Sequence, residues 1–374
     1  MAGLRPFCES DIPPVADLIW RVLHEHNTAA PASLHTHLND LFFHNPWAEE
    51  GMVSRVLEDA QGKITGFFGA VPRRMTVQEK TIRIAFGSNF VMDPTGRTVL
   101  AAIQLVKAFL KGPQDVSMTD SANEASRQLL RSLGFSVVPI YSLQWARPLR
   151  PARYATHAIS RLKKSGGARM AASLARPASI IADAMASGMK MSPFRQSRPA
   201  TADEELDSTT LLQCLNTIPS KHWLLPEYDQ NSLNWIFEFI AKRKVYGDLR
   251  KCLVRDKDRK IIGWYIYSGG RGEVGEVLQI GAESPSIGVV LDHLFYDAWQ
   301  LGLIALHGRM EPQFMQELTA RACFFFRHGS WTLVHSKNSE LMAMIQSGSA
   351  FFSRLDGEWC LRHGGLETTS DLRR

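Results

Sequence analysis

A strand, turn and helix unit in the first half of the chain constrains the fold more than any other feature. The apolar segment Ile82–Met92 predicts a strand, and the turn-forming residues 93–97 follow it. Thr98 is a typical N-cap residue ahead of an apolar run, so a helix is expected over Thr98–Leu110. A second strand, 115–119, and a short helix opened by Asn123 complete the unit. Backbone N–H groups at the start of such a helix bind phosphate groups well.

This arrangement resembles the GNAT (Gcn5-related) N-acetyltransferases. In that family the fourth strand leads into a turn and helix that hold the pyrophosphate of acetyl-CoA, and an Asn begins the helix that ends in Gly-Phe, as Asn123 and Gly134-Phe135 do here. The opening Leu4-Arg-Pro-Phe and the segment Gly62-Lys-Ile-Thr-Gly-Phe-Phe-Gly are similar to the family's first strand and central hairpin. The resemblance covers roughly residues 4–147.

The resemblance implies acetyl-CoA as co-substrate and an amine as acyl acceptor. The residues expected to bind the cofactor lie at the end of the strand, in the turn and at the starts of the two helices: Val91, Met92, Gly96, Arg97, Thr98 and Asn123. Two departures from the family pattern favour a protein without catalytic activity. The turn has one glycine and one arginine in place of the family's R/Q-x-x-G-x-G/A, and Leu130 stands where many members carry a tyrosine. The retained strand, turn and helix favour an enzyme.

Length and composition indicate a globular protein of two domains. The chain has 374 residues, of which 45% are hydrophobic, enough for two cores of ordinary size. The five cysteines are scattered without metal-ligand spacing, which is typical of a reducing compartment. The charged, proline-containing N-terminus is unlike a secretory signal, and no apolar run approaches the ~18 residues of a spanning helix. The expected location is therefore cytoplasmic.

The positive charge of the chain is concentrated between residues 150 and 200. Ten Lys and Arg residues stand there against the single acid Asp183, a net charge of +9, so the rest of a chain that carries +6 overall is at −3. The same window is rich in Ala, Ser, Gly and Pro, which marks a domain boundary. We expect a first domain over 1–148, a basic and partly helical linker over 149–200, a second domain over 201–364 and a flexible tail over 365–374.

Three interpretations of the basic linker are open. Apolar residues from Leu174 to Met189 recur at helical spacing beside a basic flank. The segment can be a connector that packs on its own domains, or residues 150–190 can contact an anionic membrane, which would make the protein peripheral to the inner membrane. Nucleic-acid binding comes third and is not expected, because aromatic side chains for base stacking are not interleaved with the basic ones.

The second half repeats the order of the first. Strands over 251–255 and 261–267 are joined by a polar turn, and a further strand, a helix over 287–300 and a strand over 303–306 follow. Thr201-Ala-Asp-Glu-Glu-Leu resembles a helix start with acids in the first turn. The fold class predicted is α/β with mixed α+β sheets: two tandem GNAT-like domains. The second copy has Glu283-Ser-Pro-Ser-Ile-Gly288 in place of a glycine-rich turn.

Candidate catalytic residues follow a strand of the second half. His307, Arg309 and Glu311 are two residues apart, so in extended backbone their side chains share one face. His307 and Glu311 are candidate general bases, with Glu276 on the preceding strand, and Arg309 is a candidate binder of an anionic group. Asn89 and Asp120 occupy comparable places in the first half and are candidate substrate-binding residues. The alternative is a solvated strand end.

Histidines 24, 26, 35, 37 and 44 gather in the first fifth of the chain. No acid or cysteine accompanies them at a fixed helical offset, so no metal is expected, and loop histidines that line a substrate mouth or lie on the surface are the simpler interpretation.

The sequence thus predicts an N-acyltransferase that moves an acetyl group from acetyl-CoA to a small-molecule amine. The closing stretch through Ser353-Arg-Leu-Asp-Gly-Glu-Trp359 is similar to bacterial tandem-GNAT proteins associated with surface-polysaccharide production, which implies an amino sugar or a polysaccharide precursor as acceptor. The alternatives are a non-catalytic GNAT-fold interaction or regulatory module, and a Fem-type aminoacyl transferase, whose long helical arm is not evident in the sequence.

Overall fold

The computed structural model describes residues 3–95, 98–162, 176–216, 224–242, 247–327 and 329–363. They form two compact units, and each unit is assembled from separate parts of the chain. Unit 1 contains the described residues of 3–142, 224–242 and 329–363, and unit 2 those of 143–216 and 247–327. This division differs from the contiguous domains 1–148 and 201–364 expected from the sequence, because each half of the chain supplies a segment to the other unit.

Unit 1 is built on an eight-stranded mixed sheet. Seven strands are hydrogen-bonded in the order β1, β2, β3, β4, β5, β15, β6, and β9 pairs with β3. All pairs are antiparallel except β4 with β5, which run parallel. The strands are β1 Gly3–Pro6, β2 Arg55–Glu58, β3 Ile64–Val77, β4 Lys80–Met92, β5 Val116–Ala122, β6 Ser136–Val137, β9 Leu225–Pro226 and β15 Trp331–His335.

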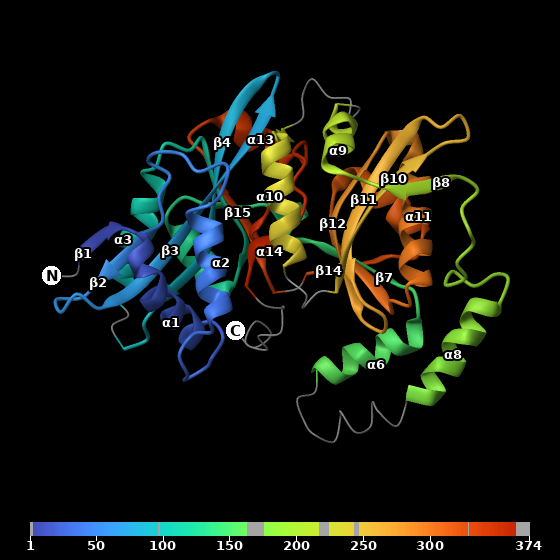
Figure 1. Cartoon of the computed structure of the whole chain (residues 1–374), viewed down its shortest axis with the longest axis horizontal. Helices are drawn as coiled ribbons and strands as arrows, with labels where there is room; N and C mark the ends of the chain where they lie inside the picture. The colour runs from blue at the N-terminus through green and yellow to red at the C-terminus, as the bar shows by residue number, and fades with distance from the viewer. Residues whose placement is uncertain are drawn as a thin grey trace. The chain divides into compact units, whose positions relative to one another are not determined.

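Helices cover both faces of this sheet (Figure 1). They do so because the apolar residues of its central strands point to both sides. Phe67 packs with α1 (Ile12–Val22) and α2 (Ala32–Phe42), and its neighbour Phe68 packs on the opposite face with α3 (Val99–Leu110) and α4 (Glu124–Ser132). The remaining helices of unit 1 are η1 Glu9–Asp11, α5 Pro139–Ser142, α10 Gln230–Ala241, α13 Ser339–Gln346 and α14 Glu358–Leu361.

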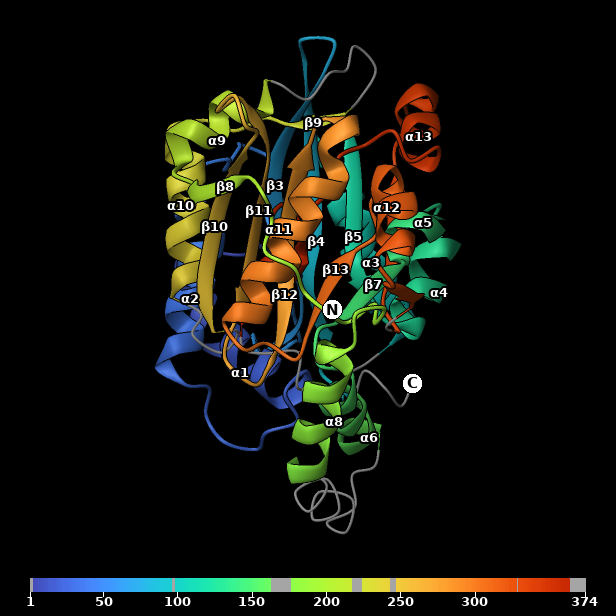
Figure 2. The same cartoon turned by 90° about the vertical axis from the view of Figure 1, so that its right-hand side faces the viewer.

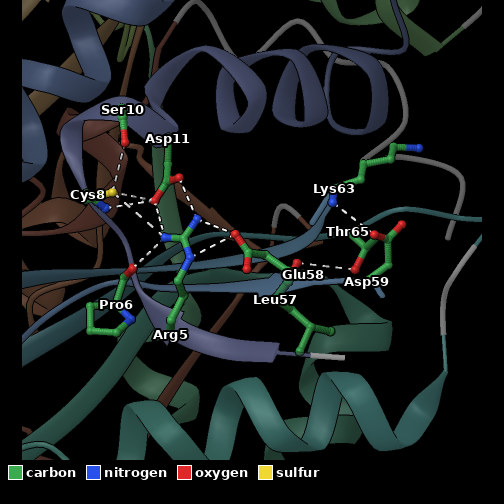
Figure 3. A network of polar contacts seen from close by, with 10 residues as sticks. All are labelled: Arg5, Pro6, Cys8, Ser10, Asp11, Leu57, Glu58, Asp59, Lys63 and Thr65. Atoms are coloured by element: carbon green, nitrogen blue, oxygen red, sulfur yellow. Dashed lines mark hydrogen bonds and ion pairs between the residues drawn. The ribbon is translucent and has the colours of Figure 1, made fainter. Parts of the chain in front are cut away.

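One arginine joins the first two strands to the first helix. The guanidinium of Arg5 donates to both carboxylate oxygens of Asp11, at 2.6 and 2.8 Å, and to Glu58 of β2 (Figure 3). Asp11 also accepts from the backbone N–H of Cys8 at 3.0 Å. These charge-assisted hydrogen bonds lower the pKa of Asp11 to about 2, with the bonds from Arg5 as the largest cause.

Asp11→Asn should therefore destabilise the protein near neutral pH and not in strong acid. A carboxylate with a lowered pKa in the folded state adds stability above its ordinary pKa of about 4, and this stability is lost as the pH falls toward 2. We expect the variant to lose roughly 1–3 kcal/mol of unfolding free energy at pH 7, measured by urea denaturation, and the difference to shrink below pH 4. Asp258→Asn, in an exposed turn, is the control. A loss independent of pH would contradict this account.

Unit 2 contains a seven-stranded mixed sheet in the order β8, β10, β11, β12, β13, β7, β14. Helix α11 (Ile287–Gln300) lies across one face of it, as Figure 2 shows. The strands are β7 Gln144–Pro148, β8 Ala202–Glu205, β10 Asp248–Arg255, β11 Ile261–Gly269, β12 Val274–Ala282, β13 Ala305–Arg309 and β14 Phe324–Phe326. The other helices are α6 Pro151–Leu162, α8 Arg176–Gly188, α9 Ser208–Leu215, η3 Ser284–Ser286, η4 Pro312–Phe314 and α12 Met315–Ala320.

The two sheets have the same strand order and the same single parallel pair. The pair β12 and β13 takes the place in unit 2 that β4 and β5 take in unit 1. The prediction of two mixed sheets of similar strand order is therefore confirmed.

A strand is exchanged between the two halves at equivalent positions. Strand β15, from the red end of the chain, lies in the sheet of unit 1 between β5 and β6, and green β7 lies among the orange strands of unit 2 (Figure 1). The exchange is reciprocal, because β7 and β15 hold the sixth place of their respective sheets. Nothing in the sequence pattern separates an exchanged strand from one that pairs within its own half.

One local prediction is wrong. Thr201–Leu206 was expected to begin a helix, but Ala202–Glu205 form the edge strand β8, antiparallel to β10. Its side chains are exposed, and Glu204 pairs with Arg255 at 2.7 Å. The helix begins later, where the Asp207 carboxylate accepts from the N–H of Thr210 at 2.7 Å. Charged side chains suit an exposed sheet edge as well as a first helical turn, so their pattern did not decide between the two.

Candidate active site

The parallel pairing of β4 with β5 in unit 1 covers only three residue pairs. Strands β4 and β5 pair from Ile84 with Val116 to Phe86 with Met118, and no pair follows. Three residues further along β4, Asn89 and Phe90 lie together opposite Phe68, which makes a β-bulge. Asn89 has a positive φ of 50°, a conformation that asparagine tolerates better than most residues. The bulge bends β4, so the two strands separate beyond this point.

A cavity of about 600 Å³ lies where the strands separate. From one face of the sheet it is lined by the end of α1 and the chain after it, including Val22, Leu23 and His24. From the other face it is lined by residues of α3 and α4, including Ala102 and Leu129. The cavity therefore passes through the sheet and connects its two faces.

Two helix N-termini border the cavity on the α3 and α4 side. Thr98 caps α3, with its hydroxyl oxygen accepting from the N–H of Ala101 at 3.1 Å, and Asn123 caps α4, accepting from the N–H of Ser126 at 2.9 Å. Thr98 and Asn123 also line the cavity. The caps orient the remaining free N–H groups of each first turn outward, the arrangement that favours anions.

The turn between β4 and α3 is held at its base by Asp93. This buried carboxylate accepts from the backbone N–H of Thr95 at 3.0 Å, and it forms ion pairs with Arg21 at 2.9 Å and Lys63 at 3.4 Å. Burial alone raises the pKa of Asp93, but these hydrogen bonds and cations outweigh burial and hold its pKa below the ordinary value. Gly96 and Arg97, expected to bind the cofactor, lie outside the residues that the structure describes.

A carboxylate from the end of the chain enters the gap between β4 and β5. The described residues from Ala350 to Leu361 run through unit 1 almost entirely buried, and they place Glu358 in the cavity. Its backbone N–H donates to the Asp120 carboxylate of β5 at 3.1 Å. Gly357 is required beside it, because any Cβ at that position would overlap the same carboxylate.

The Glu358 carboxylate accepts hydrogen bonds from both separated strands. The N–H of Asn89, in the bulge of β4, donates to Oε1 at 3.3 Å, and the hydroxyls of Thr119 (3.5 Å) and Ser121 of β5 donate to Oε2. Arg362 lies 3.9 Å from Oε1. The carboxylate thus bridges the gap that the bulge opens.

Burial raises the pKa of Glu358 above its ordinary value. Arg362 and the hydrogen bonds from Ser121 and Asn89 favour the ionised form, while the nearby Asp120 carboxylate disfavours it. The net shift is upward, so Glu358 holds its proton more tightly than an exposed glutamate. A carboxylate of this kind is a stronger base near neutral pH, when ionised, than an ordinary one.

Imidazole and guanidinium groups gather at the mouth on the α1 and α2 side. His24, Arg362 and His363 line the cavity, and the ring of His363 lies 6.1 Å from His24 and 5.3 Å from His37. Burial lowers the pKa of His24, and the nearby His26 and Arg362 lower it further. Among the residues the structure describes, no group of three or more His, Cys, Asp and Glu side chains is arranged to hold a metal ion.

In unit 2 the structure brings together two of the proposed catalytic residues. Glu276 and His307 face each other across β12 and β13, with Oε1 and Nδ1 3.8 Å apart, and His307 Nε2 lies 2.8 Å from the Tyr154 hydroxyl. Arg309 follows two residues later in β13 and Glu311 precedes η4, both buried. The 600 Å³ cavity does not include them.

A smaller cavity of about 290 Å³ lies beside the Arg5 network, lined also by Arg21 and Lys63. Its cations are engaged with acids, Arg5 with Asp11 and Glu58, and the other two with Asp93. These contacts indicate a structural role for this cluster.

Among the residues proposed from the sequence, the cavity of unit 1 gathers Asn89, Val91, Met92, Thr98 and Asn123. Asp120 contacts Glu358 from outside the lining. Sequence reasoning missed Glu358. The stretch that contains it, Ser353-Arg-Leu-Asp-Gly-Glu-Trp359, is distinctive in the sequence only for its similarity to bacterial tandem-GNAT proteins.

No protein-family model matches the sequence, and no curated protein matches it. Solved structures do share its fold. A protein from Enterococcus faecalis V583 described as a probable N-acyltransferase superposes with a TM-score of 0.58 at 9% identity, over 92% of this chain and 74% of that one. A GCN5-related N-acetyltransferase from Anabaena variabilis gives a TM-score of 0.58 at 10% identity, over 91% and 74%.

N-myristoyltransferase from Saccharomyces cerevisiae, solved with bound myristoyl-CoA and inhibitors, superposes with a TM-score of 0.52 at 9% identity, over 89% of this chain and 79% of that one. At such low identities these similarities establish the fold, which is the GNAT fold expected from the strand, turn and helix unit.

Replacing the buried carboxylate should stabilise unit 1 in alkaline solution. A carboxyl whose pKa is raised in the folded state adds stability below its ordinary pKa, and this stability is lost as the pH rises through the raised value. Glu358→Gln should therefore melt higher than the wild type at pH 8, by roughly 2–4 °C for each kcal/mol relieved, and no higher at pH 4. Glu238→Gln, exposed on α10, is the control. A lower melting temperature at pH 8 would show that the charge stabilises the fold.

Proposed function

We propose that this protein is an N-acyltransferase that moves an acyl group from a CoA thioester to an amine in the cavity of unit 1. The observation that carries the proposal is the position of Glu358, a buried carboxylate with a raised pKa in the gap between β4 and β5. Donor and acceptor can enter such a cavity from opposite faces of the sheet and meet at this carboxylate.

The α3 and α4 side suits the thioester donor. The N-termini of α3 and α4 offer backbone N–H groups to a pyrophosphate, and the apolar lining residues Phe68, Ala102 and Leu129 suit the CoA arm and acyl chain. A CoA thioester as donor is also consistent with the yeast structural neighbour, which was solved with myristoyl-CoA. Acetyl-CoA is the donor that the sequence resemblance implies, with Val91, Met92, Gly96, Arg97, Thr98 and Asn123 as its proposed contacts.

The other mouth suits the acceptor, because His24, Arg362 and His363 surround it with groups that bind polar substrates. The proposed acceptor is a small-molecule amine, and an amino sugar or polysaccharide precursor is the class that the sequence resemblance implies. Asn89 and Asp120 were expected from the sequence to bind the substrate. Because both form hydrogen bonds with Glu358, we assign them the role of positioning this carboxylate toward the substrate.

The chemistry requires the removal of one proton. The amine nitrogen attacks the thioester carbonyl carbon, the carbon–sulfur bond breaks, and the products are an amide and CoA thiolate, which takes a proton from water to become the thiol. Glu358 accepts the proton that the nitrogen loses as the new bond forms. Leu130 cannot protonate the departing sulfur, and a CoA thiolate can leave without a protein acid because its pKa is near that of an ordinary thiol. Most of the acceleration would come from positioning the two substrates.

Filling the donor side of the cavity should abolish acyl-CoA binding without unfolding the protein. Ala125 is exposed in the first turn of α4 and lines the cavity. Acetyl-CoA at 100 times its dissociation constant should stabilise the wild type by about 2.7 kcal/mol, seen as a rise in melting temperature. Ala125→Trp should reduce or remove this rise.

Ala241→Trp is the matched control, because Ala241 is exposed at the end of α10 and does not line the cavity. If wild-type protein shows no shift with millimolar acetyl-CoA or longer acyl-CoAs, the non-catalytic GNAT-fold module becomes the better account. If both tryptophan variants keep the full shift, the donor binds elsewhere.

Glu358→Gln should lower kcat about 10²–10⁴-fold, the usual contribution of a general base. In the wild type, kcat/KM should fall as the pH drops below the raised pKa of Glu358, since the base is then protonated. The kcat/KM of the variant should not show this fall. The measurement is thiol release from acetyl-CoA with a panel of amines that includes amino sugars.

A second variant tests the alternative base proposed from the sequence in unit 2. Glu276→Gln, which alters the pair with His307, should leave the reaction unaffected if unit 1 holds the active site. The opposite pattern, with loss in Glu276→Gln and none in Glu358→Gln, would assign catalysis to His307, Glu311 and Glu276, with Arg309 binding the acceptor.

A further inference from the structure

Helix α8 of unit 2 presents its apolar side chains to solvent and buries its polar ones. Ser179 and Asp183, one turn apart, are each only 5% exposed. Ile181 and Met185 of the helix and Met189 just after it, which recur every four residues, are 62%, 67% and 60% exposed. An ordinary surface helix has the reverse arrangement, so α8 is built to place its apolar face against something outside this unit.

The rotation of α8 is fixed by its contact with α6. The Asp183 carboxylate accepts from the backbone N–H of Ala152 at 2.7 Å, at the start of α6, and from the Arg153 side chain at 2.8 Å. This carboxylate both caps α6 and forms an ion pair with its first turn. Helix α8 cannot turn its apolar face inward without breaking these bonds.

Large hydrophobic side chains are also exposed on α6 and just after α8. The large hydrophobic side chains exposed on α6, on α8 and just after it are Ile159, Ile180, Ile181, Met185, Met189 and Met191. Moving such side chains from water into an apolar environment is favourable. Methionine adapts to irregular apolar surroundings, and three of these residues are methionines.

Exposed basic residues follow this apolar surface in the chain. Lys190, Arg195 and Arg198 are exposed just after α8. The only acid between residues 150 and 200 is Asp183, which Arg153 engages, so the segment has a net charge of +9 by sequence while the rest of the chain is at −3. An apolar helical face beside a concentration of positive charge is typical of helices that lie on anionic bilayers.

We propose that α8 docks on an anionic lipid surface, with Ile181, Met185 and Met189 inserted among the acyl chains. Helix α8 has 13 residues and lies along the surface, and no helix in the described parts of the chain is long and apolar enough to cross a bilayer. Exposed Lys190, Arg195 and Arg198 contact the anionic headgroups and add electrostatic attraction near the surface.

A lipid surface fits this face better than a second copy of the chain. A symmetric dimer through α8 would bring two segments of charge +9 against each other, and like charges at close range oppose association. The exposed acids of β8, Asp203, Glu204 and Glu205, would offer charge to the basic residues but no apolar surface to cover Ile181, Met185 and Met189.

Sedimentation of the full chain with vesicles tests the proposal. The wild type should pellet with vesicles of phosphatidylcholine and phosphatidylglycerol, and binding should fall as salt rises, because screening shortens the range of attraction. Met185→Asp with Met189→Asp should weaken binding about tenfold or more. Lys190→Glu with Arg198→Glu should weaken it and remove most of the salt dependence.

Met315→Asp is the matched control, since Met315 is an exposed methionine on α12 of the same unit, and it should bind as the wild type does. Circular dichroism and thermal melting check that each variant is folded. Equal sedimentation with pure phosphatidylcholine, or none with either vesicle, would overturn the proposal. So would a dimer in light scattering that the Met185 and Met189 changes convert to a monomer, because the face would then bind a second copy.

Discussion

The early end of hydrogen bonding between β4 and β5 is the constraint on which the candidate site depends. Parallel strands normally continue to pair, and a sheet without a gap has no route from one face to the other. Here three rungs form, and the bulge at Asn89 and Phe90 then bends β4 away. This opening joins the helix N-termini on one face of the sheet to the histidines on the other, so both can line one cavity.

An opening in a sheet leaves polar groups that need partners, and the chain supplies them from its far end. Glu358 takes hydrogen bonds from both separated strands, and Asp120 in turn holds the backbone N–H of Glu358. The bonds compensate only part of the cost of burying a charge, which is why the pKa of Glu358 is raised. Burying this charge lowers the free energy of unfolding, so the position of Glu358 is better explained by the proposed reaction than by a contribution to stability.

Sequence reasoning succeeded where the cause is local. The caps at Thr98 and Asn123 and the strand before them depend on neighbouring residue types, and the structure has them as expected. It failed where partners are distant. Glu358 meets Asp120 across 238 positions of sequence, and no periodicity reports such a pairing. The interleaved assignment of β7 and β15 was hidden for the same reason, since an exchanged strand has the same alternation as any other.

The exchanged strand also determines when the site can exist during synthesis. Until residues 331–335 leave the ribosome, β5 has an unpaired edge and β6 lacks the strand it pairs with, because β15 lies between them. The nascent first half therefore presents an open sheet edge while residues 138–330 are still being made, a state prone to wrong pairing. The site around Glu358 can therefore form only after β15 and residue 358 have been made.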